Sequence, residues 1–257
     1  MAVELTRDGA LGYVTLDKPP ANSYDKAFMD ELTTAIETAG GDDDIKVVIL
    51  RSASKRFFSA GADVKAFTQN PPDGNMAMIE VAHRGLARIA ELPKLFIAQI
   101  AGHALGGGLE MALACDLRFG ARGSYRLGVP EVTLGLLPGN GGTQRLPRLI
   151  GASRALELMV TGRQISPGEA HALGILNRLL AADRLEDETR AYAERLATGA
   201  TKAIGAIKQV VHQGVDQSLA DGLAGERERI RELFGTADAD EGMAAFLEKR
   251  KPEYRGA

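Results

Sequence analysis

The segment from residue 95 to residue 119 constrains the fold most, because it reads as a strand, a glycine turn, a helix and a second strand. Residues 95–98 are apolar, three glycines stand at 106–108, and residues 109–115 are apolar apart from Glu110. Another short strand pattern follows at once, at residues 116–119. Strands that alternate with helices in this way indicate an α/β core whose strands follow one another in sequence order.

The preceding sequence shows the same alternation. Residues 3–7 and 12–16 alternate apolar and polar side chains around Asp8-Gly9, which predicts a β-hairpin. A chain of 257 residues is long enough to bury one large core. The spacing of apolar residues then predicts a helix over residues 28–39, a strand at 47–50 and an amphipathic helix over 76–92.

Beyond Gly141 the pattern changes from strands to helices, with one further strand expected at residues 174–177. Ser166-Pro-Gly-Glu169 is a capping box with proline at the first helical position, and Asp183-Arg-Leu-Glu186 predicts a second helix start. Bulky apolar residues keep helical spacing to the last residues, and a thin helical appendage cannot bury them alone. We therefore expect a C-terminal helical region that packs on a neighbouring subunit or on the core.

Composition argues against several classes of protein. A net charge of −3 gives no global attraction to nucleic acid or to an anionic membrane. The single cysteine, Cys115, allows no intramolecular disulfide and is expected to be a small buried apolar residue.

Residues 1–10 lack the apolar region of a signal peptide, and no apolar run approaches the roughly 18 residues of a membrane helix, so we expect a cytoplasmic protein. The four histidines lack the spacing of a zinc pair, so no metal site is expected.

Two glycine turns are placed to present backbone N–H groups to a ligand. Residues 57–63 read FFSAGAD, where Gly61 permits a tight turn, although this segment taken alone is better explained as an ordinary strand-to-helix turn. Within residues 102–116 three glycines open a helix, and the N-terminus of a helix favours developing negative charge. The spacing is not G-x-G-x-x-G and the strand is not the first of the chain, which argues against a dinucleotide site.

One glutamate accompanies the glycine triplet and a second follows it. Glu110 stands three residues after Gly107 and on the same face of the helix, where it serves either the helix dipole or proton chemistry beside a carbonyl group. Glu131 is the only acid in residues 127–146, which are rich in turn residues. Taken alone, Glu131 would be read as a surface carboxylate.

Together the three segments resemble the crotonase superfamily, and within it the enoyl-CoA hydratase/isomerase family. The matching motifs are F-S-A-G-A-D, then A-L-G-G-G-x-E-x-A-x-x-C-D, then P-E-x-x-L-G-x-x-P-G-x-G-G-T-Q-R-L, and the resemblance covers essentially the whole chain. It implies an α/β fold, a crotonase-like spiral of ββα units over residues 1–195. Residues 196–257 would be a C-terminal helical region that forms trimers, often paired into hexamers.

The resemblance also implies roles for individual residues. The N–H groups of Ala62 and Gly107 would form an oxyanion hole for the thioester carbonyl of an acyl-CoA, with Glu110 and Glu131 as the acid–base pair. The chain departs from the family pattern at two places: the early loop, residues 21–25, reads A-N-S-Y-D where A-L-N-A-L is commoner, and Leu127 stands where many relatives have phenylalanine. Both departures leave the acyl chain length open. Residues expected to contact coenzyme A or the acyl group are Ala21, Ala60, Asp63, Val64, Lys65, Gly106, Pro130, Leu134, Gly139 and Lys249, the last near the phosphates and in some assemblies from a neighbouring subunit.

These implications lead to a 2-enoyl-CoA hydratase that needs no metal, flavin or nicotinamide, since coenzyme A is part of its substrate. Hydratases of the family carry both glutamates, and both are present here. A Δ3,Δ2-enoyl-CoA isomerase, which needs one carboxylate, and other acyl-CoA lyases or hydrolases of the same fold stay open as alternatives. A few relatives bind RNA, but the only basic cluster here is residues 249–251, so no nucleic-acid partner is expected.

Overall fold

The computed structural model describes residues 1–256 and consists of nine strands and eleven α-helices in that range. The strands are β1 (Val3–Asp8), β2 (Leu11–Leu16), β3 (Val47–Ser52), β4 (Phe57–Ser59), β5 (Leu95–Ile100), β6 (His103–Leu105), β7 (Leu117–Ala121), β8 (Leu127–Gly128) and β9 (Arg178–Leu180). The helices are α1 (Lys26–Gly41), α2 (Val64–Gln69), α3 (Pro72–Glu91), α4 (Gly107–Ala114), the 3₁₀ turn η1 (Glu131–Leu134), α5 (Gly142–Ile150), α6 (Ala152–Thr161), α7 (Pro167–Ala172), α8 (Leu185–Ala197), α9 (Thr201–Gly214), α10 (Leu219–Leu233) and α11 (Ala237–Glu248).

From β3 onward, successive strands fall alternately into two sheets. The larger sheet has the order β1-β2-β3-β5-β7-β9 and the smaller one the order β4-β6-β8. Only the β1–β2 hairpin is antiparallel, and every other pairing in the two sheets is parallel. Each of the pairs β3–β4, β5–β6 and β7–β8 thus gives one strand to each sheet before the chain turns into helix. This is the spiral of ββα units that the sequence predicts.

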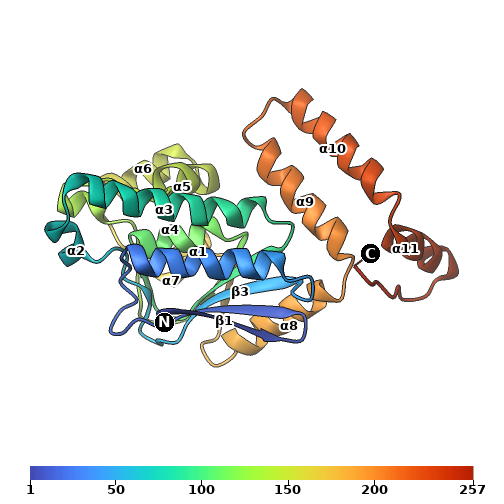
Figure 1. Cartoon of the computed structure of the whole chain (residues 1–257), viewed down its shortest axis with the longest axis horizontal. Helices are drawn as coiled ribbons and strands as arrows, with labels where there is room; N and C mark the ends of the chain where they lie inside the picture. The colour runs from blue at the N-terminus through green and yellow to red at the C-terminus, as the bar shows by residue number, and fades with distance from the viewer. Residues whose placement is uncertain (257) are drawn as a thin grey trace.

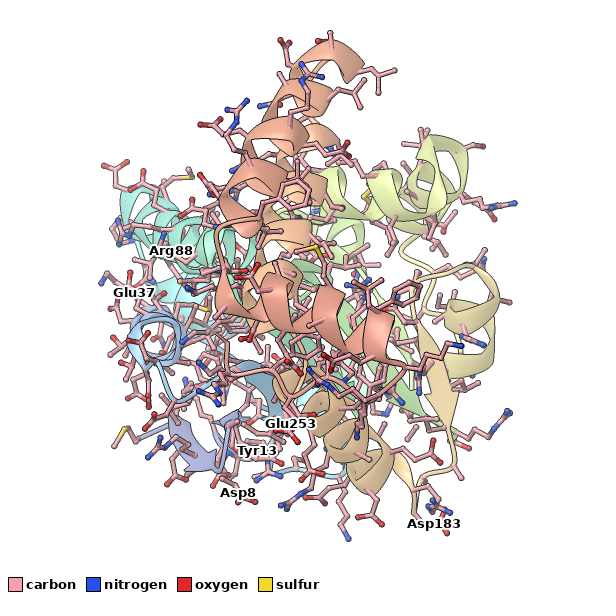
Figure 2. The ribbon with its side chains drawn as sticks, turned by 90° about the vertical axis from the view of Figure 1, so that its right-hand side faces the viewer. Asp8, Tyr13, Glu37, Arg88, Asp183 and Glu253 are labelled. Atoms are coloured by element: carbon pink, nitrogen blue, oxygen red, sulfur yellow. The ribbon has the colours of Figure 1, made fainter. Side chains whose placement is uncertain are left out.

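Helices cover both faces of the larger sheet, as Figure 1 shows. The helices α1 and α3 lie side by side on one face, and α8 lies on the other. Glu37 on α1 and Arg88 on α3 are accordingly on one flank in Figure 2, and Asp183, just before α8, is at the opposite edge. The strands between these layers are apolar on both sides: all four residues from Val47 to Leu50 are buried, as parallel strands covered on two faces require.

A buried ion pair anchors the first of the C-terminal helices, α9, to the core. On α9, Lys208 is buried and its ammonium group forms an ion pair with Asp116 at 2.9 Å, while His212 contacts the other oxygen of Asp116 at 2.8 Å. Lys208 also donates to the main-chain oxygens of Ile89 and Lys94. Figure 1 shows α10 and α11 projecting away from the sheet beyond this anchor.

The projecting helices expose large apolar side chains. Phe246 and Leu247 on α11 are 82% and 80% exposed, and Leu219 on α10 is 80% exposed. Leu219 and Phe246 belong to the periodic apolar set of the C-terminal third, so the prediction that the core of one chain does not cover that set is consistent with the structure. The division of the chain at residue 195 stays a prediction.

Two local predictions are wrong. Residues 174–177 are not a strand: the N–H groups of Ile175 and Leu176 both donate to the oxygen of Ala170 at the end of α7, and Gly174 has a φ of +85°. Their apolar side chains are buried through a turn, and the strand follows at β9. Asp183 does not cap α8 either, because Arg184 occupies the N-cap without a side-chain hydrogen bond.

Two other predictions are confirmed. Ser166 caps α7 and accepts from the N–H of Glu169 at 3.2 Å. Cys115 is buried, and burial raises the pKa of its thiol to about 12. Among residues 1–256, no helix has both the length and the apolar composition needed to cross a bilayer.

Candidate active site

Two glycine turns, one after β4 and one before α4, lie against each other. Gly61 has a φ of +90°, and a Cβ atom at this position would lie 2.8 Å from the oxygen of Leu105 and 3.2 Å from the nitrogen of Gly107. The parallel pairing of β4 with β6 places the ends of both strands at the same edge. Strands far apart in sequence thereby bring the A-G-A-D and G-G-G motifs into direct contact.

The N–H groups of Ala62 and Gly107 are both left without a backbone acceptor in the described chain. The main chain of Tyr24 pairs with the residues on either side of Ala62: its N–H donates to Gly61, and its oxygen accepts from Asp63. In a parallel bridge of this kind the residue opposite Tyr24, here Ala62, points its own N–H away from Tyr24. Gly107 is the first residue of α4, where N–H groups have no intrahelical partner. The structure thus provides two adjacent free donors, as an oxyanion hole requires.

Gly108 fixes the distance between these turns. A Cβ atom on Gly108 would lie 2.3 Å from the oxygen of Ser59, a backbone atom at the end of β4. Contacts below 3.0 Å do not occur for real Cβ atoms, so the helix and the strand can approach this closely only with glycine at position 108.

We therefore expect Gly108→Ala to push α4 away from β4. Overpacking of this kind costs about 1–3 kcal/mol of stability, and a displacement of about 1 Å at a reaction centre costs up to about 10²-fold in rate. Urea denaturation and the turnover of an acyl-CoA substrate would measure the two effects. Gly41→Ala is the matched control, because a Cβ atom on Gly41 at the end of α1 meets nothing within 4 Å. Equal stability and activity of the two variants would contradict the expectation.

Glu110 lies in the first turn of α4 and is only 1% exposed. Its Oε1 atom accepts from the N–H of Asn140 at 2.8 Å and from the N–H of Gly142 at 2.7 Å. Burial raises the pKa of this carboxyl, and the two backbone donors and the nearby Arg145 oppose the increase. The loop before α5 therefore clamps one oxygen of Glu110 and fixes the direction of the other.

Glu131 approaches the same turn from η1. A Cβ atom on Gly106 would lie 2.7 Å from its Oε1 atom, so the carboxylate packs directly on the glycine turn. Its Oε2 atom is buried and has no hydrogen-bond partner among the described residues. Burial, and secondarily the charge of Glu110, raise the pKa of Glu131 to about 7. Two buried carboxyl groups with raised pKa values thus lie at one glycine turn, an arrangement typical of acid–base sites.

Tyr24 and Asn140 complete the cluster, and the sequence did not single them out as site residues. The hydroxyl of Tyr24 accepts a hydrogen bond from the Nδ2 atom of Asn140 and lies against Gly107, where a Cβ atom would be 1.9 Å away. Tyr24 and Asn140 are 3% and 4% exposed. The only sequence signal was the departure of the loop at residues 21–25 from the family pattern.

Most residues expected to contact coenzyme A or the acyl group lie around this cluster. The N–H of Ala60 donates to the oxygen of Ala21 at 2.9 Å, so these two loops are paired. Asp63 caps α2 by accepting from the N–H of Lys65 at 3.0 Å, and Lys65 and Val64 are exposed at the start of that helix.

Pro130 and Gly139 bracket the segment that carries Glu131. Pro130 directly precedes η1, and the oxygen of Gly139 contacts His83 on α3 at 2.6 Å. Gly106 has a φ of +54°, and its N–H donates to the oxygen of Gly128 at 2.8 Å.

Three of the predicted positions differ in exposure or lie away from the cluster. Leu134, at the end of η1, is 57% exposed. Leu127 is fully buried in β8, where it packs in the core. Lys249 follows α11, at the far end of the molecule from α2 in Figure 1, so one chain does not bring it to the cluster. A contact of Lys249 with coenzyme A would require a neighbouring subunit.

Comparison with known proteins agrees with this geometry. The family model for enoyl-CoA hydratase/isomerase matches residues 6–257. A probable enoyl-CoA hydratase of Bacillus subtilis (strain 168) is 38% identical over 260 residues, which cover 99% of each chain. The mitochondrial enoyl-CoA hydratase domain-containing protein 2 of Homo sapiens is 39% identical, over 97% of this chain and 87% of the human protein.

Solved structures give the same result. The enoyl-CoA hydratase of Geobacillus kaustophilus HTA426 superposes with a TM-score of 0.98 at 42% identity, covering 100% of this chain and 97% of the other. The enoyl-CoA hydratase of Bacillus anthracis superposes with a TM-score of 0.95 at 35% identity, covering 100% of both chains. By sequence, fold and the arrangement of its glycine turns, this chain belongs to the enoyl-CoA hydratase/isomerase family of the crotonase superfamily.

Proposed function

We propose that this protein is an enoyl-CoA hydratase, which adds water syn to a trans-2-enoyl-CoA and gives a 3-hydroxyacyl-CoA. The observation that carries the proposal is the presence of two carboxyl groups, Glu110 and Glu131, against the glycine turn that opens α4. Hydration needs one group to remove a proton from water and another to deliver a proton to carbon, and this cluster contains both.

The chemistry follows from the positions of these groups. The N–H groups of Ala62 and Gly107 would hold the thioester oxygen and stabilise the enolate that forms when water attacks C3. Removing one such donor in other enzymes costs about 2.7–4 kcal/mol, so the pair should contribute strongly to catalysis. Glu110 takes one proton from the attacking water, and the protonated Glu131 delivers its proton to C2. One proton therefore passes into the pair and one leaves it in each cycle, so no metal or redox cofactor is required by this scheme.

A Δ3,Δ2-enoyl-CoA isomerase is the nearest alternative within the family. Isomerisation moves a single proton between two carbons and needs only one well-placed carboxylate. This site has a carboxylate beyond the one that isomerisation needs. It is Glu110, held by two backbone donors at 2.7 and 2.8 Å, and its presence supports hydration over isomerisation. Acyl-CoA lyases and hydrolases of the same fold would differ in the groups that reach the acyl chain.

We also propose that the working form is a homotrimer or a pair of trimers that binds acyl-CoA thioesters. The exposed apolar side chains of α10 and α11 support this assembly, since a second copy would remove them from water. Sedimentation or light scattering measures the assembly directly, and a monomer at micromolar concentration would contradict it.

The first test is the loss of enone-thioester absorbance when the purified protein is mixed with crotonyl-CoA. Rapid loss, with 3-hydroxybutyryl-CoA as the product, would support the hydratase. Absence of turnover with short, medium and long 2-enoyl-CoAs would contradict it, and turnover of 3-enoyl-CoA alone would identify the isomerase.

The pair of carboxyl groups also predicts the pH dependence. The active form carries one proton on the pair, because one member must accept and the other must donate. The pKa of Glu131 is about 7, so raising the pH through this value removes that proton. We expect kcat/KM to fall about tenfold per pH unit above pH 7. Hydration consumes no net proton, so kcat/KM for dehydration of the product must fall above pH 7 in the same way.

Stopped assays of kcat/KM in both directions, in buffers of constant ionic strength, would measure the profile. In Glu131→Gln the residual activity should lose the alkaline limb, because the titrating carboxyl group is absent. A wild-type profile that stays flat from about pH 6 to about pH 9 would show that Glu131 does not carry the proton.

A further inference from the structure

The polar groups of the cluster are not all paired with one another. The hydroxyl of Tyr24 accepts from Asn140, but its own O–H donates to no acceptor in the described chain. The Oδ1 atom of Asn140 and the Oε2 atom of Glu131 are buried and without a donor. One donor and two acceptors thus remain open beside Gly107.

Open hydrogen-bonding groups of this kind are unusual in a protein interior. A buried polar atom that lacks a partner costs about 1–3 kcal/mol, and most buried side-chain polar atoms are paired. Here two such atoms, on Asn140 and Glu131, and the open O–H donor of Tyr24 come from three separate elements, the loop before α5, η1 and the loop before α1. Their convergence at one turn indicates that they bind something other than the protein itself.

The open groups match one small molecule. A water molecule can accept from the O–H of Tyr24, donate one hydrogen to Oδ1 of Asn140 and keep its other hydrogen for Glu110; Oε2 of Glu131 would then carry the proton that goes to C2. We propose that Tyr24, together with Asn140, binds the water molecule that adds to C3 of the substrate; this rests on the proposed hydratase function. Neither residue would be a proton carrier: the water transfers its proton to Glu110 and its oxygen bonds to carbon.

The surroundings of Tyr24 suit such a role. Its main chain is fixed on both sides, by the bond from its N–H to Gly61 at 3.0 Å and by the bond from Asp63 to its oxygen at 2.8 Å. The phenol cannot shift toward α4, because it already lies against Gly107. Burial, and then the charges of Glu110 and Glu131, raise its pKa, so the hydroxyl stays protonated and keeps its donor.

Asn140 links the proposed water to the general base. Its main-chain N–H binds Glu110 at 2.8 Å, while its side chain binds Tyr24. The carboxylate and the phenol are therefore positioned by one residue. This link fixes the position of the water relative to Glu110, and it does not involve the thioester.

The test is Tyr24→Phe, which keeps the ring and removes only the hydroxyl. Two reactions of the same protein distinguish an effect on water binding from an effect on the rest of the site. Hydration of crotonyl-CoA needs the water; exchange of the C2 proton of butyryl-CoA in D₂O needs only the thioester site and the base at C2. We expect kcat for hydration to fall about 10- to 100-fold, as for leaving a buried hydrogen-bonding group without its partner, with KM and C2 exchange changed by less than about twofold.

Tyr125→Phe is the matched control. Tyr125 is also buried, and its hydroxyl lies 2.9 Å from the oxygen of Ala121 and 3.1 Å from the oxygen of Ile100, away from the cluster. This variant should keep both reactions. Asn140→Ala should resemble Tyr24→Phe, and the double variant should lose little more than either single variant because the two residues bind one water.

Equal losses of hydration and C2 exchange in Tyr24→Phe would overturn the proposal, because the hydroxyl would then shape the whole site. Unchanged hydration in that variant would also overturn it, while leaving the hydratase function in place. A wild-type protein that exchanges the C2 proton but hydrates no enoyl-CoA would overturn the hydratase function itself, and the water site with it.

Discussion

Glu110→Gln and Glu131→Gln are each expected to lower kcat for enoyl-CoA hydration by several hundredfold or more. A general acid or base contributes about 10²–10⁴-fold to a rate, and an amide can neither accept nor deliver the proton. The exchange preserves size, and in Glu110→Gln the amide oxygen can still accept from the N–H groups of Asn140 and Gly142. The substitutions should therefore lower kcat and leave the folding of the protein unchanged.

The assay is the same absorbance change with crotonyl-CoA, with circular dichroism and light scattering to verify fold and assembly. Glu37→Gln is the control, because Glu37 is an exposed glutamate on α1, on the flank labelled in Figure 2. It should retain full activity. If either active-site variant kept more than about a tenth of the wild-type rate, far above the range for an acid–base group, that glutamate would not be part of the acid–base pair.

Lys208→Met is expected to lower the free energy of unfolding by about 3–5 kcal/mol, the cost of removing one partner of a buried ion pair. The side chains of Lys208 and Asp116 are 2% and 6% exposed. Without the ammonium group, Asp116 keeps one bond from the N–H of Phe96 and the contact with His212, and the oxygen of Lys94 loses a donor. The burial that lowers the pKa of Lys208 is the same burial that makes its loss costly.

Lys202→Met is the matched control, because Lys202 is an exposed lysine on the same helix, α9. Urea denaturation of both variants, at equal protein concentration, separates the buried pair from the general effect of removing a lysine. A decrease in Lys208→Met no larger than in Lys202→Met would show that the pair does not anchor α9.

Much of the site could be predicted from sequence because its parts are local. Glu110 stands in the first turn of a helix that three glycines open, and this position fixes its direction relative to the turn. The glycine of A-G-A-D marked a tight turn, and Gly61 has the positive φ and the close backbone approach that such a turn needs; its place in the site was inferred only from the motifs taken together. Glu131 was found only through the family motif, since nothing in its own segment indicates burial.

Tyr24 and Asn140 could not be predicted, because 116 residues separate them and no pattern marks their contact. Their meeting depends on how the loop before α1 lies on β4 and on how the loop before α5 lies on α4. The wrong strand prediction at residues 174–177 has the same origin. An apolar pair such as Ile175 and Leu176 can be buried by a strand or by a turn, and only the tertiary structure decides between them.

The order of strands in the two sheets has a consequence for synthesis of the protein. Because β1-β2-β3-β5-β7-β9 and β4-β6-β8 both follow the chain, each strand that leaves the ribosome meets an edge that is already formed. The sheets can therefore grow in one direction without waiting for a distant partner. A nascent chain that has reached α4 would already contain Glu110 and both glycine turns. It would still lack Glu131 and Asn140, so the ability to hold and activate water would be acquired only when the segment before α5 has emerged.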